Sequence, residues 1–116
     1  MTVIAEPDFG LHASEIERIR SVLATYPQVE QALVYGSRAK GTHRPGSDID
    51  LVLVGSLTRK DLNQIETELD DLLMPYPLDV SLHALIDKPE LLAHIRRVGR
   101  PIYRASEHAG AHGLKR

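Results

Sequence analysis

Two neighbouring stretches of the chain carry side chains that could perform phosphate chemistry. Gly36-Ser37 ends one apolar run, and Asp48-Ile49-Asp50 opens the next. Alternate residues of a β-strand face the same way, so the Asp48 and Asp50 carboxylates would project together, about 6.6 Å apart along the strand. Such a pair repels unless cations lie between its members, and Mg²⁺ binds a few carboxylates together with water and phosphate oxygens. Because glycine lets phosphates approach backbone N–H groups, the pattern predicts metal-assisted phosphoryl or nucleotidyl transfer.

Three other interpretations of the same stretch are weaker. Gly36 to Thr42 has the glycine spacing of a Walker A loop, but Thr42 stands where that loop has its lysine. An EF-hand starting at Asp48 would lack the glycine at its sixth position and the acidic residue at its twelfth. A plain strand–turn–strand would explain the glycines. It would not explain two carboxylates at the head of a buried strand, where charge must be neutralised.

The length of the chain limits its domain organisation. A chain of 116 residues fits one domain with a single core and leaves little room for a second substrate-binding lobe. Hydrophobic residues make up 42% and charged residues 26% of the sequence, as is typical of a soluble globular protein. We expect the domain to span residues 1–104. Residues 105–116 are polar and aperiodic, so we expect a disordered C-terminal tail there.

The charge balance and the cysteine count narrow the functional classes. A formal net charge of -2 gives no overall basic field for duplex nucleic acid, so we expect no direct nucleic-acid binding. The chain contains no cysteine, which excludes disulfides and thiolate metal sites. The N-terminus lacks a signal pattern, and the apolar runs are too short to cross a bilayer. We therefore expect a cytoplasmic protein without membrane contact.

Apolar periodicity predicts the elements before the aspartate pair. Ser14 and Glu17 have the spacing of a capping box, and the helical stripe that follows them ends at Pro27. Residues 31–35 form a short apolar run that we interpret as a strand. A helical turn over residues 37–40 is expected to lead away from the end of that strand.

The aspartate pair opens a run, 49–54, that is almost continuously apolar and predicts a central strand buried on both faces. Thr58 is suited to cap the next helix, whose apolar stripe extends to Leu73 before Pro75 stops it. Residues 78–85 alternate between apolar and polar side chains, which predicts a third strand with one polar face.

The last part of the chain predicts one more helix and an edge strand. Asp87 and Pro89 suit the start of the helix, and Gly99 has the position expected of a C′ glycine at its end. Residues 102–103 are expected to add the edge strand. The alternation of helices and strands predicts an α/β (α+β) protein with a small mixed β-sheet flanked by helices.

The glycine and aspartate stretches together resemble a known family. Gly36-Ser37 followed by Asp48-x-Asp50 is similar to the defining motif of the DNA polymerase β-like nucleotidyltransferase superfamily. The fuller strings, residues 36–41 and 46–51, most resemble the minimal nucleotidyltransferase (MNT) proteins. The resemblance runs from the first strand to about residue 103, and it implies the polymerase β-like nucleotidyltransferase fold.

The resemblance implies catalytic and metal-binding roles for three aspartates. A third carboxylate is expected on a neighbouring strand, and Asp79 fits this place because the alternation of its strand puts it on the polar face. Asp48, Asp50 and Asp79 would together hold two Mg²⁺ ions, and Asp79 would accept the proton of the attacking hydroxyl. Metal ions of this kind lower the pKa of the nucleophile and stabilise in-line displacement at phosphorus.

The resemblance also implies a set of nucleotide-binding residues, with ATP as the substrate. Gly36 and Ser37 would fix the triphosphate through backbone N–H groups and the Ser37 hydroxyl. Arg38 would neutralise phosphate charge, although a basic residue in a first helical turn can equally be a surface residue. Ser47 would orient Asp48 or shape the turn before it.

The small size of the chain makes it most similar to the antitoxins of two-gene HEPN/MNT toxin–antitoxin systems. The resemblance implies a protein adenylyltransferase that transfers AMP from ATP to a tyrosine of a cognate HEPN ribonuclease toxin and so neutralises it. The HEPN toxin would be the partner in a hetero-oligomer. Two alternatives stay open, namely an antitoxin that acts by binding alone and a small-molecule nucleotidyltransferase whose helical partner holds the acceptor.

Overall fold

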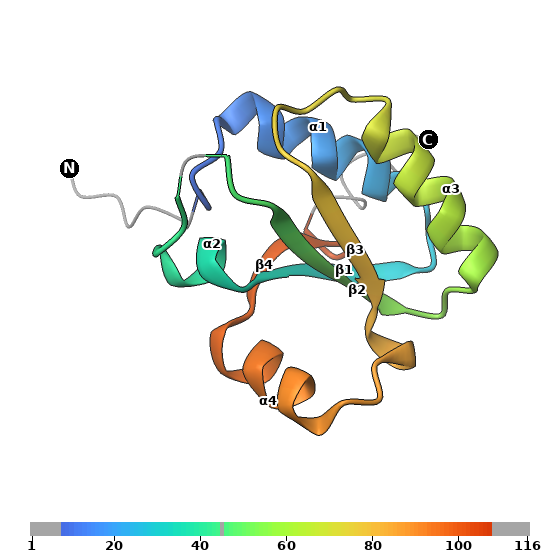
Figure 1. Cartoon of the computed structure of the whole chain (residues 1–116). Coiled ribbons are helices and arrows are strands. Elements are labelled where there is room, and N and C mark those ends of the chain that lie inside the picture. Colours follow the sequence, from blue (N-terminus) through green and yellow to red (C-terminus); the bar gives the residue numbers. More distant parts are fainter. Residues whose placement is uncertain (1–7, 45, 108–116) are drawn as a thin grey trace.

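The computed structural model describes residues 8–44 and 46–107, and Figure 1 shows how its elements are arranged. The elements in chain order are α1 (Ala13–Ala24), β1 (Val29–Tyr35), α2 (Ser37–Lys40), β2 (Ile49–Gly55), α3 (Arg59–Asp70), β3 (Leu78–Leu82), the 3₁₀ turn η1 (His83–Leu85), α4 (Pro89–Val98) and β4 (Arg100–Arg104). The predicted α/β class is confirmed. Residues 105–107 form a turn, and the rest of the expected tail lies outside the described residues.

The four strands form one mixed sheet in the order β3-β2-β1-β4. Strand β1 pairs antiparallel with both β2 and β4, whereas β2 and β3 are parallel. The parallel pair needs a crossover, which α3 provides. The expected strand at residues 102–103 is confirmed as the centre of β4, and both β3 and β4 are edge strands.

The sheet has two differently covered faces, with α1 and α3 on one side and α4 on the other (Figure 1). Ile49 and Leu51 of β2 are fully buried in the larger apolar cluster, which α1 and α3 cover. Val52 is fully buried in a smaller cluster with Ile95 of α4, so this strand is buried on both faces as predicted. Because alternate strand residues share a face, Asp50 lies with Val52 on the α4 side.

The larger cluster supplies most of the burial that stabilises the sheet. Its fully buried side chains include Ile19 and Leu23 of α1 and Ile65 of α3. Burying a side chain of this size contributes about 1.5–3 kcal/mol relative to leaving it exposed. The helical stripes predicted from the sequence are therefore packing surfaces. None of the helices among the described residues has both the length and the apolar character needed to cross a membrane.

The first helix is capped by His12, two residues before the predicted cap at Ser14. The backbone N–H of His12 donates to the Glu15 carboxylate at 2.9 Å, so the box runs from His12 to Glu15, and the prediction of Ser14 and Glu17 was wrong. Leu11 is 5% exposed, and its burial directs the chain into the helix immediately after His12. Ser14 is therefore already inside the first turn.

The third helix has the predicted cap but ends earlier than its apolar stripe suggests. The helix ends at Asp70, five residues before Pro75, so the proline is not what stops it. Leu73 has φ of 55° and is 85% exposed, so its assignment to the buried stripe was wrong. The chain turns away from the core there, and the left-handed conformation of Leu73 redirects it toward β3.

Two predictions in the last third of the chain also need correction. Strand β3 ends at Leu82 rather than at residue 85, because His83–Leu85 turn into η1. Gly99 is the C-cap of α4 in an extended conformation, with φ of −62°, and is not a left-handed C′ glycine. A Cβ at Gly99 would lie 2.5 Å from the Ile95 carbonyl oxygen, so close backbone approach explains the glycine.

The cap of α3 yields a stability prediction. The Asp61 N–H donates to Thr58 Oγ1 at 3.1 Å, and the Thr58 N–H donates back to Asp61 Oδ2 at 2.9 Å. Replacing Thr58 by alanine removes the acceptor, and we expect the free energy of unfolding to fall by about 1 kcal/mol. Urea denaturation measures this change. Thr58→Ser keeps the hydroxyl and should lose much less; equal losses in the two variants would contradict the cap assignment.

Candidate active site

The strand registers bring three polar side chains into one row across the sheet. Tyr35 of β1 is paired with Asp50 of β2, and Asp50 is paired with Asp79 of β3. Directly opposed residues of neighbouring strands point to the same face, so this row lies on the α4 side. The structure thus brings together two of the three aspartates predicted from the sequence, and their catalytic and metal-binding roles stay predictions.

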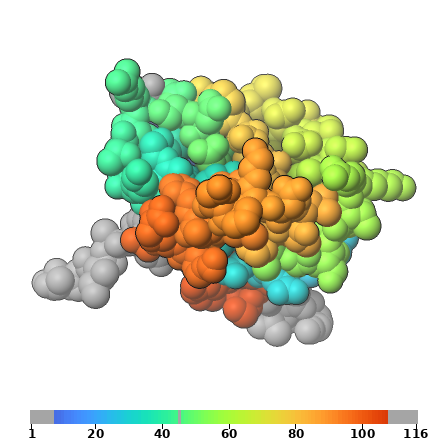
Figure 2. Space-filling view, turned by 60° about the horizontal axis from the view of Figure 1, so that its bottom comes forward, coloured from blue at the N-terminus to red at the C-terminus, as the bar shows by residue number. Residues whose placement is uncertain are grey.

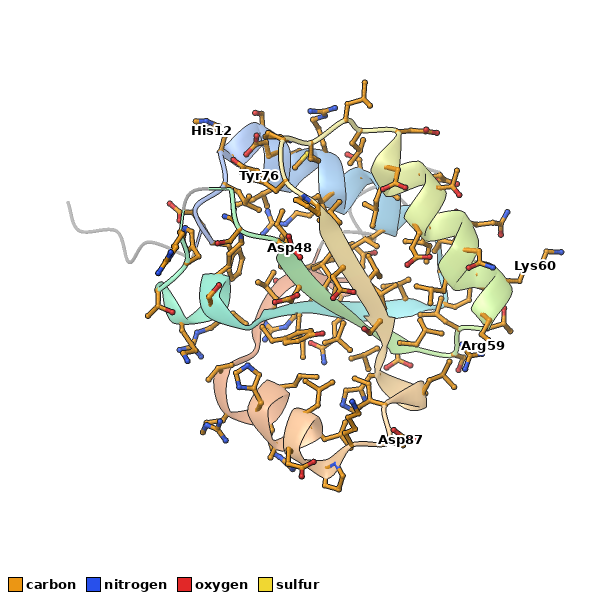
Figure 3. All side chains as sticks on the ribbon, viewed as in Figure 1. His12, Asp48, Arg59, Lys60, Tyr76 and Asp87 are labelled. Atoms are coloured by element: carbon orange, nitrogen blue, oxygen red, sulfur yellow. The ribbon has the colours of Figure 1, made fainter. Side chains whose placement is uncertain are left out.

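Asp48 lies immediately before β2, at the edge of the row. The Ile49 N–H donates to the Pro77 carbonyl oxygen at 2.9 Å, which ties this part of the chain to the start of β3. In Figure 3, Asp48 lies at this end of β2 and β3, whereas Asp87 lies at the far end, beyond η1. Asp50 is half-buried, whereas Asp48 and Asp79 are exposed, so only the Asp50 carboxylate lies partly in the interior.

The carboxylate of Asp50 is in an unfavourable electrostatic position. Burial raises its pKa above the usual value of 3.8, and the charges of Asp79 and Asp48 raise this pKa further, whereas His94 lowers it. The raised pKa means that the folded state binds this proton more tightly than the unfolded state does. Ionisation of Asp50 therefore lowers stability as the pH rises from 3.8 through the raised pKa.

Gly36 connects β1 to α2 and lies directly against Asp50. Its φ is +75°, and a Cβ there would lie 2.5 Å from the Asp50 Oδ2 atom. Both the backbone conformation and this contact require glycine. Ser37 follows as the first residue of α2 and is half-buried beside it. The predicted pair is therefore next to the aspartate row, and nucleotide contact by Gly36 and Ser37 stays a prediction.

Arg38 and Ser47 hold the loop that leads to Asp48. Arg38 is 3% exposed, and its Nε and Nη2 atoms donate to the Ser47 carbonyl oxygen at 3.1 and 2.9 Å. Its Nη1 atom donates to the Phe9 carbonyl oxygen at 2.7 Å, and its guanidinium carbon lies 4.5 Å from the centre of the Tyr76 ring.

The hydroxyl of Ser47 completes this loop by donating to the Arg44 carbonyl oxygen at 2.7 Å. In this structure Arg38 and Ser47 therefore position the backbone before Asp48. Their predicted contact with nucleotide stays a prediction.

Sequence reasoning missed two side chains of this site, Tyr35 in the row and His94 beside it. His94 of α4 lies edge-on to the Tyr35 ring, with the ring centroids 6.1 Å apart and the ring planes at 80°. Its Nε2 atom accepts a hydrogen bond from the Gly36 N–H at 3.3 Å. Tyr35 could have been found from its position just before Gly36, but an aromatic residue at a strand end is usually core. Nothing in the sequence around His94 indicates this contact, because 58 residues separate it from Gly36.

The carboxylates of Asp48, Asp50 and Asp79 suit a hard divalent cation. The three aspartates offer carboxylate oxygens, which Mg²⁺ prefers, and burial together with the charges of Asp79 and Asp48 raises the pKa of Asp50, so a bound cation would favour its ionised form. No three potential ligand side chains among residues 8–44 and 46–107 form a ready-made metal cluster. Mg²⁺ commonly takes only one or two carboxylates and completes its shell with water and substrate phosphates. Asp48, Asp50 and Asp79 therefore suit an ion that is bound together with a nucleotide.

A comparison with protein families agrees with this chemistry. Residues 17–108 match the family described as polymerase beta, nucleotidyltransferase. The match spans most of the chain, and the chain therefore belongs to this family. The superfamily and the fold predicted from the glycine and aspartate stretches are confirmed. A comparison with curated proteins finds no match.

Solved structures with a similar fold include chains from toxin–antitoxin complexes. One is a toxin–antitoxin with AMP-PNP, at a TM-score of 0.64 and 17% identity, covering 86% of this chain and 82% of that one. Another is the toxin–antitoxin MntA-HepT, at 0.61 and 14%, covering 90% and 82%. A third is a tri-AMPylated Shewanella oneidensis HEPN toxin in complex with MNT antitoxin, at 0.60 and 14%, covering 88% and 80%. At these identities the likeness concerns the fold.

The electrostatics of Asp50 yield a prediction for the metal-free protein. We expect Asp50→Asn to raise the midpoint of thermal unfolding at neutral pH, because it removes a charge that folding disfavours. The gain should shrink as the pH falls toward 3.8, where the wild-type carboxyl becomes protonated in both states. Calorimetry in the presence of a chelator measures both effects.

The control for this prediction is Asp87→Asn, which changes an exposed aspartate far from the row (Figure 3). This variant should leave the midpoint nearly unchanged. A metal-free Asp50→Asn protein that is less stable than the wild type at neutral pH would show that the Asp50 charge is compensated within the chain.

Proposed function

We propose that this protein is an MNT-type antitoxin, a Mg²⁺-dependent adenylyltransferase that transfers AMP from ATP to a tyrosine of a HEPN ribonuclease toxin and thereby neutralises it. The observation that carries the proposal is the register of Asp50 with Asp79 beside Gly36. This arrangement combines two carboxylates with a glycine whose backbone N–H borders them. Such a combination suits the transfer of a nucleotidyl group from a triphosphate.

The aspartates and the Gly36-Ser37 pair would have separate roles in the transfer. Asp48, Asp50 and Asp79 would hold Mg²⁺, which when bound would neutralise the phosphates and lower the pKa of the attacking hydroxyl. Asp79 would accept the proton of a hydroxyl that approaches from solvent, and its exposure on the edge strand β3 supports this role. Gly36 and Ser37 would orient the triphosphate so that pyrophosphate leaves opposite the attacking oxygen.

The position of the row favours a macromolecular acceptor. Asp48 and Asp79 are exposed at the side of the sheet that β3 borders. A tyrosine projecting from the surface of a folded partner could therefore reach them without entering a closed cavity. The fold likeness to chains of toxin–antitoxin complexes, one with AMP-PNP and one with a tri-AMPylated HEPN toxin, supports a toxin as that partner. We further propose that the reaction takes place in the cytoplasm.

Intact-mass spectrometry tests this proposal directly. The polypeptide encoded beside this chain would be incubated with the protein, Mg²⁺ and each nucleoside triphosphate in turn. We expect mass steps of one AMP with ATP only, and a loss of rate of at least about a hundredfold in Asp48→Asn or Asp50→Asn. Asp87→Asn, the distant exposed aspartate, should transfer at the wild-type rate.

The same experiment separates the alternatives. A tight complex without any mass change, together with full neutralisation by Asp50→Asn, would refute transfer and favour an antitoxin that acts by binding alone. AMP attached to a small molecule instead of the polypeptide would favour a small-molecule nucleotidyltransferase with a helical partner.

A further inference from the structure

His94 borders the row of aspartates, and the proposed function gives it no role. The residue lies on α4, the helix that occupies the middle of the face shown in Figure 2 and covers the Asp50 side of the sheet. Its side chain is half-buried, and the edge-on contact with Tyr35 restrains the ring. The Nε2 atom of His94 accepts from the Gly36 N–H at 3.3 Å.

The N–H that His94 accepts is the same donor that the proposed function assigns to the phosphate tail. The position of this donor is fixed, because Gly36 has a φ of +75° and lies against the Asp50 carboxylate without space for a Cβ. A phosphate oxygen that takes the Gly36 N–H must therefore replace the His94 Nε2 atom. Such an oxygen would remain in contact with the displaced imidazole.

The chemistry of imidazole makes this contact favourable. A neutral imidazole carries one N–H donor and one acceptor nitrogen, and its two tautomers exchange readily in water. The tautomer with hydrogen on Nδ1 accepts at Nε2, as in the contact with Gly36. The tautomer with hydrogen on Nε2 donates, so a small rotation of the ring would aim this N–H and the Gly36 N–H at one phosphate oxygen.

We propose that His94 is a nucleotide-binding residue. In the free protein it accepts the Gly36 N–H, and in the nucleotide complex it donates to the triphosphate. The proposal rests on the proposed function, since it names a further residue of the same site.

Nucleotide binding by variants of His94 tests the proposal. The probe is α,β-methylene-ATP with Mg²⁺, which cannot undergo the transfer, and isothermal titration calorimetry measures its dissociation constant. We expect His94→Ala and His94→Phe each to weaken binding about tenfold, the usual effect of losing one hydrogen bond to a charged group. His94→Gln, which offers both an acceptor and a donor, should remain within about threefold of the wild type.

Each variant excludes a different explanation. His94→Phe retains a ring against Tyr35, so full binding by this variant combined with weak binding by His94→Ala would assign His94 to packing and overturn the proposal. Tighter binding by His94→Ala would also overturn it, because His94 would then only block the Gly36 N–H. The midpoint of thermal unfolding of each variant shows that it is folded at the temperature of the titration.

His83→Ala is the matched control. His83 is an exposed histidine of η1, outside the row, and its removal should leave the dissociation constant unchanged. A wild-type protein that fails to bind the analogue would refute the proposed function itself. Wild-type binding that His94→Ala leaves unchanged would refute only the role of His94.

Discussion

The partial burial of one carboxylate beside others is the constraint on which the rest of this structure depends. The register of β2 and β3 sets Asp50 beside Asp79, and the sheet partly buries Asp50. In that environment an uncompensated negative charge lowers stability, as the raised pKa of Asp50 indicates. The surrounding elements reduce this cost in two ways. Gly36 leaves space for the carboxylate, and His94 approaches it from α4.

A second feature of the structure fixes the position of the backbone that leads to Asp48. Arg38 has almost no solvent exposure, yet all of its described hydrogen bonds go to backbone carbonyl oxygens rather than to an acid. A guanidinium suits this task because its donors lie in one rigid plane, and its face can rest on the Tyr76 ring. One cation thereby joins the segment at Phe9, the loop at Ser47 and the segment at Tyr76 that leads into β3.

The parts that local sequence specifies were predictable, and the parts that depend on packing were not. The glycine and aspartate stretches carry their chemistry in residue type and spacing, so the family and the position of Asp50 could be predicted. The cap of α1 was misplaced because two acceptable capping pairs overlap and the burial of Leu11 decides between them. Leu73 continues the helical periodicity, and only the path of the chain toward β3 excludes it from the core. His94 reaches the row through the position of α4, which no local pattern encodes.

The order of the strands has a consequence for how the protein matures during synthesis. Strand β1 is central in the sheet, yet its second neighbour is β4, the last strand among the described residues. Until residue 104 has emerged from the ribosome, one edge of β1 has no partner and can pair with another chain. The helix that covers Asp50, α4, also ends only one residue before β4 begins. A chain shortened before β4 would thus carry all three aspartates and leave this edge of β1 open to pairing with another chain.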